Sequence, residues 1–141
     1  MPLKHSKLTS LMVDYVKLNF DTTFMAIWAD LEEYAYCEKE VAYIENNPIP
    51  LNAYPDLRAI DEFSDPNIHI IGEAKTERDY LNRNLEAEIQ MDVYINVLKT
   101  KQKPFLIYSV PAAIRNKVHQ DIKNKLIFYN AENINFEVFY R

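Results

Sequence analysis

The stretch PDLRAIDEFSDPNIHIIGEAK, residues 55–75, decides how the centre of this chain can fold. Its first part, LRAIDEF, predicts a short strand, and the β-branched run NIHIIGEAK predicts a second strand. Between them, the residues FSDPN favour a tight return of the chain. The two strands are therefore expected to pair as a hairpin, with the start of the first strand beside the end of the second.

At the end of the second strand, alternation places two charged side chains on one face. In an extended chain Glu73 and Lys75 point to the same side, because successive side chains alternate. Hairpin pairing would bring Asp56, at the start of the first strand, to the same edge of the sheet. Two carboxylates that converge with a lysine predict a magnesium site and a group that can polarise or deprotonate water.

The same strand holds Gly72, the only glycine in the chain. Because glycine has no side chain, the face opposite Glu73 and Lys75 is left bare at this position. A neighbouring helix or the backbone on the substrate side could therefore approach the strand closely. We expect Gly72→Val to disturb the packing behind the site more than comparable changes in residues 68–71.

Outside the hairpin, helical and extended patterns alternate along the chain. The prolines between residues 45 and 56 favour an extended or turning connection. The other predicted elements are an amphipathic helix over 7–20, a strand (or, alternatively, a helix) over about 23–31, a helix over about 80–99, a fully buried strand over 104–110, a helix over 111–126 and an edge strand over 134–140. This order predicts an α/β fold with a mixed central β-sheet flanked by helices, in one domain spanning 1–141.

The helix predicted over 80–99 contains a glutamine that should face inward. On a helical wheel, Gln90 and Glu86 fall within the apolar arc, which also contains Tyr94. A buried amide without a partner costs about 1–3 kcal/mol, so Gln90 needs hydrogen bonds, either from ordered water at an active site or from a backbone carbonyl. The opposite, solvent-facing arc is predicted to contain Glu88, Asp92, Asn96 and Lys99.

These residues together resemble the motifs of a known enzyme family. Pro55-Asp56, then Glu73-Ala74-Lys75, then Gln90 with Tyr94 resemble the PD-(D/E)xK nuclease superfamily. The Gln-x-x-x-Tyr spacing is similar to that of its RecB-type branch, and the resemblance is closest over residues 54–98. It implies a restriction-endonuclease-like core and a metal-dependent nuclease that hydrolyses phosphodiester bonds in DNA, with RNA as the alternative substrate.

The resemblance also implies a role for each matched position. Asp56 and Glu73 would bind one or two Mg²⁺ ions, which Mn²⁺ could replace, together with the backbone carbonyl of Ala74. Lys75 would orient or activate the attacking water, and Gln90 would position that lysine, the water or the DNA backbone. Further substrate contacts are expected from Tyr94, which would either pack beneath the site or touch the strand, and from the basic residues Arg78 and Arg83.

Many members of the family place a further acid on the first helix, and this chain offers no clear equivalent. Asp14 falls on the polar side of the first predicted helix, so the role is not assigned to it. Glu32, Glu33 and Glu86 remain candidates. None of the three histidines is predicted to bind metal: His5 and His119 have no partners at ligand spacing, and His69 is expected to be packed or exposed.

Charge is distributed unevenly along the chain. The net charge is −5, made up of −7 over residues 1–70 and +2 over residues 71–141. A polyanion should therefore meet the second half, where lysines 99, 101 and 103 form one group, although solvated helix faces and loop ends are an equally good interpretation. An acidic domain of this size offers little surface for a duplex, so a homodimer or larger assembly is expected to complete it.

The remaining sequence features concern location and alternatives. A single cysteine excludes an internal disulfide framework, and no signal peptide or long apolar span is visible, so a cytoplasmic protein without membrane contact is expected. The alternatives to an active nuclease are a non-catalytic relative that binds nucleic acid or protein, and a nuclease subunit of a larger assembly. The intact set of two acids and one lysine favours the enzyme.

Overall fold

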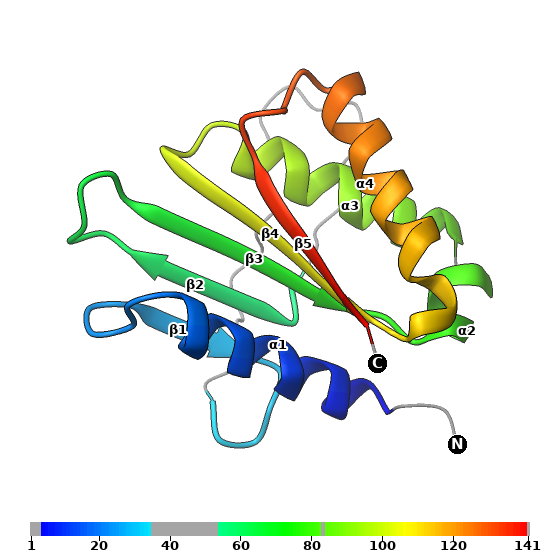
Figure 1. The fold of residues 1–141 in the computed structure, drawn as a ribbon, viewed down its shortest axis with the longest axis horizontal. Helices are drawn as coiled ribbons and strands as arrows, with labels where there is room; N and C mark the ends of the chain where they lie inside the picture. The colour runs from blue at the N-terminus through cyan, green and yellow to red at the C-terminus, as the bar shows by residue number, and fades with distance from the viewer. Residues whose placement is uncertain (1–3, 35–53, 83, 141) are drawn as a thin grey trace.

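The computed structural model describes residues 4–34, 54–82 and 84–140, which form a sheet with helices on both faces (Figure 1). Helix α1 lies on one face, and helices α3 and α4 lie on the other. In chain order the elements are α1 His5–Asn19, β1 Ala26–Ala29, β2 Leu57–Asp61, β3 Ile68–Ala74, α2 Glu77–Asn82, α3 Asn84–Leu98, β4 Lys103–Val110, the short 3₁₀ helix η1 Ala112–Ile114, α4 Arg115–Phe128 and β5 Asn135–Tyr140.

The sheet is mixed, and its strands follow the order β1-β2-β3-β4-β5. Strands β1, β2 and β3 pair antiparallel, whereas β3, β4 and β5 pair parallel. Strand β3 therefore belongs to both halves of the sheet and is buried on both faces from His69 to Ala74. The predicted α/β class with a mixed, helix-flanked sheet is confirmed, and β5 lies at an edge as predicted.

The hairpin predicted from residues 55–75 is also present. Leu57 pairs with Gly72, and Asp61 pairs with Ile68 at the other end of the ladder. One face of β3 packs against α1, and the other packs against α3. This register fixes which side chains meet at the open end of the hairpin.

Gly72 lies where α1 packs closely against the sheet. A Cβ atom added at Gly72 would lie 2.5 Å from the Sδ atom of Met12 and 3.2 Å from the Cβ atom of Leu57. Both neighbours are fully buried, so a side chain at position 72 would have to displace packed atoms. The expected close approach of a helix on this face is therefore confirmed.

Some boundaries differ from the predictions. The strand predicted over 23–31 is limited to Ala26–Ala29. In place of the single helix predicted over 80–99, the structure has α2, which begins earlier, at Glu77, and α3, which ends at Leu98. The proline-rich connection lies mostly outside the described residues.

Two helical-wheel predictions for α3 are wrong: Glu86, predicted within the apolar arc, is exposed, and Asp92, predicted on the solvent-facing arc, is buried. Asp92 is buried rather than exposed, because Lys125 of α4 lies 2.6 Å from its Oδ1 atom. The ion pair between α3 and α4 therefore satisfies the Asp92 carboxylate, which the helical wheel placed on the solvent-facing side. The wheel could not anticipate it, since the lysine is distant in sequence.

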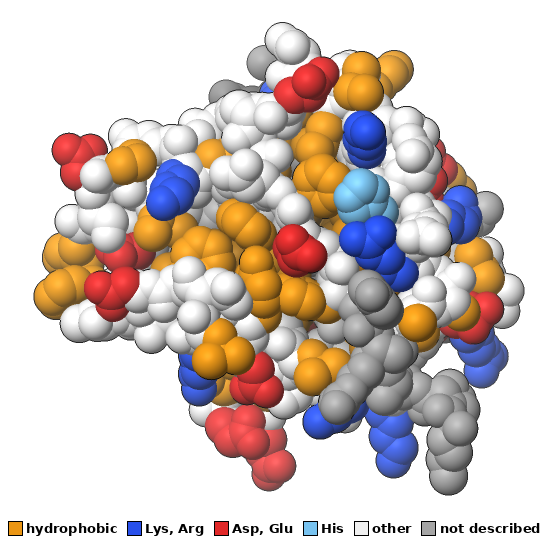
Figure 2. Space-filling view, in the orientation of Figure 1, with side chains coloured by type: hydrophobic (Ala, Val, Ile, Leu, Met, Phe, Trp, Pro, Cys, Tyr) orange, Lys and Arg blue, Asp and Glu red, His pale blue; other side chains and the backbone are white. Residues whose placement is uncertain are grey.

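Hydrophobic side chains form a band across one face of the molecule (Figure 2). Between α1 and the sheet, the rings of Tyr15 and Phe139 have centroids 4.1 Å apart. At the end of the sheet where two loops meet, the exposed rings of Phe24 and Phe63 lie 5.9 Å apart. The aromatic residues on this face thus serve mainly to pack α1 and to form one exposed pair.

Candidate metal centre and active site

The register of the hairpin places two carboxylates opposite each other. Because Leu57 pairs with Gly72, the next residue along each strand brings Asp56 across from Glu73. Residues directly opposite in an antiparallel pair point to the same face, with Cβ atoms about 4.5–5.5 Å apart. Both residues are nearly inaccessible, with 7% of Asp56 and 3% of Glu73 exposed. The convergence of Asp56 and Glu73 predicted from the sequence is confirmed.

Asp56 is held in place by the backbone of its neighbours. The amide of Ala74 donates to Asp56 Oδ2 at 2.8 Å, and the amide of Asp30 donates to the Asp56 carbonyl at the same distance. The first bond crosses the hairpin and the second extends the pairing of β1 with β2. Asp56 is therefore fixed by two strands, although it precedes the first residue of β2.

Glu73 has a phenol on one side and an ammonium group on the other. The hydroxyl of Tyr94, on α3, donates to Glu73 Oε2 at 2.5 Å. The Nζ atom of Lys75 lies 3.9 Å from Glu73 Oε1, and the lysine side chain is itself largely buried. Lys75 thus reaches the carboxylates as predicted, whereas Tyr94 is fully buried and packs beneath the site instead of facing the substrate side.

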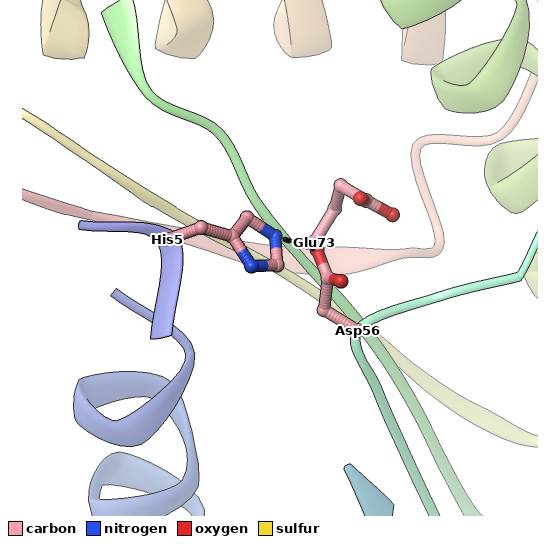
Figure 3. A group of neighbouring side chains, drawn as sticks. All are labelled: His5, Asp56 and Glu73. Atoms are coloured by element: carbon pink, nitrogen blue, oxygen red, sulfur yellow. Dashed lines mark hydrogen bonds and ion pairs between the residues drawn. The ribbon is translucent and has the colours of Figure 1, made fainter. Parts of the chain in front are cut away.

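A third candidate ligand, His5, comes from the first residue of α1 (Figure 3). Its Nε2 atom lies 3.0 Å from Asp56 Oδ2. The prediction that His5 has no partner is therefore wrong. Helix α1 is held against the end of the sheet by Ser109 of β4, whose hydroxyl donates to the Leu8 carbonyl at 2.7 Å, and this contact brings His5 to the carboxylates.

His5 could have been found only from weak signals in the sequence. It stands at the start of an amphipathic helix, and a titratable residue at that position is available to a site at the end of a sheet. The partner, however, lies 51 residues away along the chain. The packing of the helix on the sheet, which a periodicity argument does not fix in rotation or depth, decides the contact.

The ionisation of the three side chains is linked. Burial is the main reason that the pKa of Glu73 lies well above its ordinary value, and the negative charge of Asp56 raises it further. Burial also opposes the charge on Asp56, but hydrogen bonds from His5, Glu73 and the Ala74 amide outweigh this effect and hold the pKa of Asp56 below its ordinary value. The hydrogen bond to Asp56 is the main reason that the pKa of His5 is raised. In the protein without metal, the raised pKa values of Glu73 and His5 thus favour the protonated forms of both side chains.

These side chains fit a divalent metal ion. One ligand atom from each of His5, Asp56 and Glu73 can be chosen so that all three lie within 4.8 Å of one another. Carboxylate oxygens suit Mg²⁺ and Mn²⁺, whereas an imidazole nitrogen is a better ligand for transition metals than for Mg²⁺. The donor set is therefore suited to Mn²⁺ at least as well as to the predicted Mg²⁺. Its chemistry does not by itself identify the metal.

The other predicted site residues lie at different distances from this cluster. Gln90 is partly buried, and its Oε1 atom has no hydrogen-bond partner among the described residues, so the protein group expected to satisfy an inward amide is not found for this atom. Arg78 is exposed on α2, and Arg83 lies outside the described residues. The three glutamates considered as a further acid, Glu32, Glu33 and Glu86, are exposed and do not belong to the cluster.

No family model, curated protein or solved structure matches the chain. Among the described helices, none is both long and apolar enough to cross a membrane. The interpretation of the cluster therefore depends on its geometry and chemistry. The resemblance to PD-(D/E)xK nucleases is a separate expectation, which comes from the sequence.

Proposed function

We propose that the protein is a metal-dependent nuclease that hydrolyses phosphodiester bonds by attack of water, with DNA as its substrate. The convergence of Asp56 and Glu73 beside Lys75 carries the proposal. Two carboxylates directly opposite each other in a sheet repel one another, so the pair is unfavourable for folding alone. A function that needs both acids explains why they occupy a position that is nearly closed to solvent.

Each residue contributes something that phosphodiester hydrolysis requires. Asp56, Glu73 and His5 would hold the metal ion, and the Ala74 carbonyl could supply a further oxygen. When bound, a divalent ion supplies charge that stabilises the phosphate and the leaving oxygen. Lys75 is an ammonium donor next to Glu73 and is suited to orient the water that attacks. Tyr94 would fix the rotamer of Glu73 through its hydroxyl hydrogen bond.

The accessibility of these groups suggests where a substrate would enter. The His5 side chain is 37% exposed, whereas the Asp56 side chain is 10% exposed. Solvent therefore reaches the cluster mainly beside the first turn of α1. A strand that reaches the metal from this side would meet His5 before the buried carboxylates.

Nucleolytic activity can be tested directly with the purified protein. Single-stranded and double-stranded DNA and RNA are incubated with Mg²⁺, Mn²⁺ or EDTA, and the products are separated by length. The protein is compared with Asp56→Ala and Lys75→Ala. Matched controls are Asp14→Ala, an exposed acid of α1, and Lys123→Ala, an exposed lysine of α4.

The expected result is metal-dependent cleavage that both site variants lose and both controls retain. Loss of a group that transfers or positions a proton typically lowers a rate about 10²–10⁴-fold. Cleavage in EDTA, or cleavage that Asp56→Ala and Lys75→Ala retain, would contradict the assignment. Binding of DNA without cleavage under any metal condition would instead favour the non-catalytic relative or a subunit that needs its assembly.

A further inference from the structure

A second polar site lies at the other end of strand β3. There, a cavity of about 190 Å³ is lined by residues of β2, β3 and the loops that flank them, including His69, Thr100, Lys101 and Gln102. His69 and Glu73 are four residues apart on one strand, which corresponds to about 13 Å. The cavity is therefore separate from the carboxylate cluster.

The hydrogen bond between Arg58 and His69 fixes which atom of the imidazole carries a proton. Arg58 Nε donates to His69 Nε2 at 3.4 Å, and a guanidinium group can only donate. The neutral ring must then carry its proton on Nδ1. None of the hydrogen bonds found among the described residues uses Nδ1, and His69 lines the cavity. The ring therefore offers an N–H donor that has no protein acceptor in the described part of the chain.

The charged groups that act on the His69 ring are positive. Burial is the main cause that lowers the pKa of His69 to about 4, and the cations Arg58 and Lys101 lower it further. Among the ion pairs of the described residues, none includes Arg58 or Lys101. Glu62 also lines the cavity, but it is exposed and makes no ion pair with either cation. An anion would satisfy these donors and both positive charges.

We propose that His69 and Lys101, which line the cavity, and Arg58, which donates to the His69 ring, form a binding site for a phosphate group. A guanidinium group, an ammonium group and a neutral N–H donor are the groups that bind phosphate oxygens in proteins. The cavity exceeds the roughly 30 Å³ that one water molecule occupies in the liquid, so it has room for more than a single water. The phosphate is either a free anion or part of a nucleic acid strand. Neither case requires that the carboxylate cluster binds metal.

The site can be tested in buffer that contains EDTA, so that its result does not depend on nuclease activity. Inorganic phosphate is titrated into ¹⁵N-labelled protein, and the ring signals of His69 are followed by NMR. A second arm uses a short single-stranded DNA, and a third uses the corresponding duplex. The protein is compared with Lys101→Gln and Arg58→Lys, and Lys123→Gln is the matched control because Lys123 is an exposed lysine on α4.

Phosphate is expected to shift the His69 signals with saturation, and the control should behave like the unmodified protein. Lys101→Gln and Arg58→Lys should each weaken binding roughly tenfold, because each removes charge-assisted hydrogen bonds. Lys101 is exposed in a loop, so its replacement tests the site without a threat to folding. A response to DNA with none to free phosphate would identify a strand as the source. Absence of any response in all three arms, or equal affinity in Lys101→Gln, would overturn the proposal.

Discussion

The two ends of strand β3 hold histidines in opposite environments. At the end near Glu73, His5 meets the carboxylate of Asp56, and its pKa is raised mainly by that hydrogen bond. At the other end, His69 meets the guanidinium group of Arg58, and its pKa falls to about 4 through burial and the nearby cations. One strand therefore lies between a histidine that meets a carboxylate and a histidine that meets a guanidinium group.

Burial alone does not explain this difference. It lowers the pKa of both rings, since a desolvated imidazolium ion is unfavourable. Only at His5 does a neighbouring carboxylate overcome the effect of burial. The sign of the adjacent charge, set by strand register and by helix packing, thus decides whether the pKa of a histidine lies above or below its ordinary value.

The largest expected effect is on cleavage, and it follows from removal of the Glu73 carboxylate. We expect Glu73→Gln to lower metal-dependent cleavage at least about 100-fold, because it removes a proposed metal ligand. The same change should raise the stability of the metal-free protein at neutral pH, since an amide does not carry the unfavourable buried charge. Cleavage assays and thermal unfolding in EDTA measure the two effects.

A matched substitution separates these effects from general damage. Glu132→Gln changes an exposed glutamate in the turn before β5 and should alter neither quantity. If Glu73→Gln destabilised the metal-free protein, the carboxylate would be a structural group rather than a strained one. Unchanged cleavage would exclude Glu73 from the chemistry.

The next effect concerns the packing that supports both ends of β3. Gly72→Val should lower the free energy of unfolding by about 1–3 kcal/mol, because the new side chain would overlap Met12 and Leu57. Denaturant unfolding measures the loss, with Ile70→Val as a control that removes one methylene from the same face. In the double variant Gly72→Ala with Met12→Ala, the smaller side chain at position 12 should leave room for the new Cβ atom at position 72. This should relieve part of the clash. Equal losses for Gly72→Val and Ile70→Val would contradict the expected close approach.

How much of the structure can be predicted from the sequence depends on whether the interacting residues are close together along the chain. Alternation along β3 and the return at residues 62–67 were sufficient to place Asp56 beside Glu73, because a hairpin has a simple register. The order of helices and strands was predictable for the same reason, since hydrophobic periodicity acts within each element.

Contacts between distant elements were not predictable in this way. His5 reaches Asp56 only because α1 docks on the sheet near Ser109, which is 101 residues from Leu8. Asp92 is buried only because a lysine of α4 lies above it. Each depends on the rotation and depth of a helix on its neighbours, and a helical wheel contains neither quantity.

A smaller effect is the dependence of stability on pH in the metal-free protein. The pKa of Glu73 lies above its ordinary value of 4.5 in the folded state, so its contribution is present below pH 4.5 and is lost as the pH rises through the folded pKa. The raised pKa of His5 acts in the same direction above its ordinary value of 6.5. The lowered pKa of Asp56 has the opposite sign, and its contribution is lost only as the pH falls below 3.8.

A comparison with Glu73→Gln isolates the contribution of this carboxylate. The lowered pKa of His69 makes the folded state more stable as the pH rises from 4 to 6.5, and this change is the same in both proteins. The difference in unfolding free energy between the two proteins should therefore grow in favour of the variant as the pH rises above 4.5. Denaturant unfolding in EDTA across this range measures it. A difference that does not change with pH would show that Glu73 has the same pKa folded and unfolded.

The smallest expected effect is on the pKa values of His5 and His69, which can be measured directly. In NMR titrations without metal, His5 should gain its proton above pH 6.5 and His69 only near pH 4, with the signals assigned by substitution of each residue. Asp56→Asn removes the carboxylate that stabilises the imidazolium ion, so the pKa of His5 should fall while that of His69 stays unchanged. Addition of Mn²⁺ should broaden the His5 signals at a lower concentration than the His69 signals if His5 binds metal. Equal pKa values for the two rings would remove the contrast between the ends of β3, and a pKa of His5 that is unaffected by Asp56→Asn would assign its shift to another group.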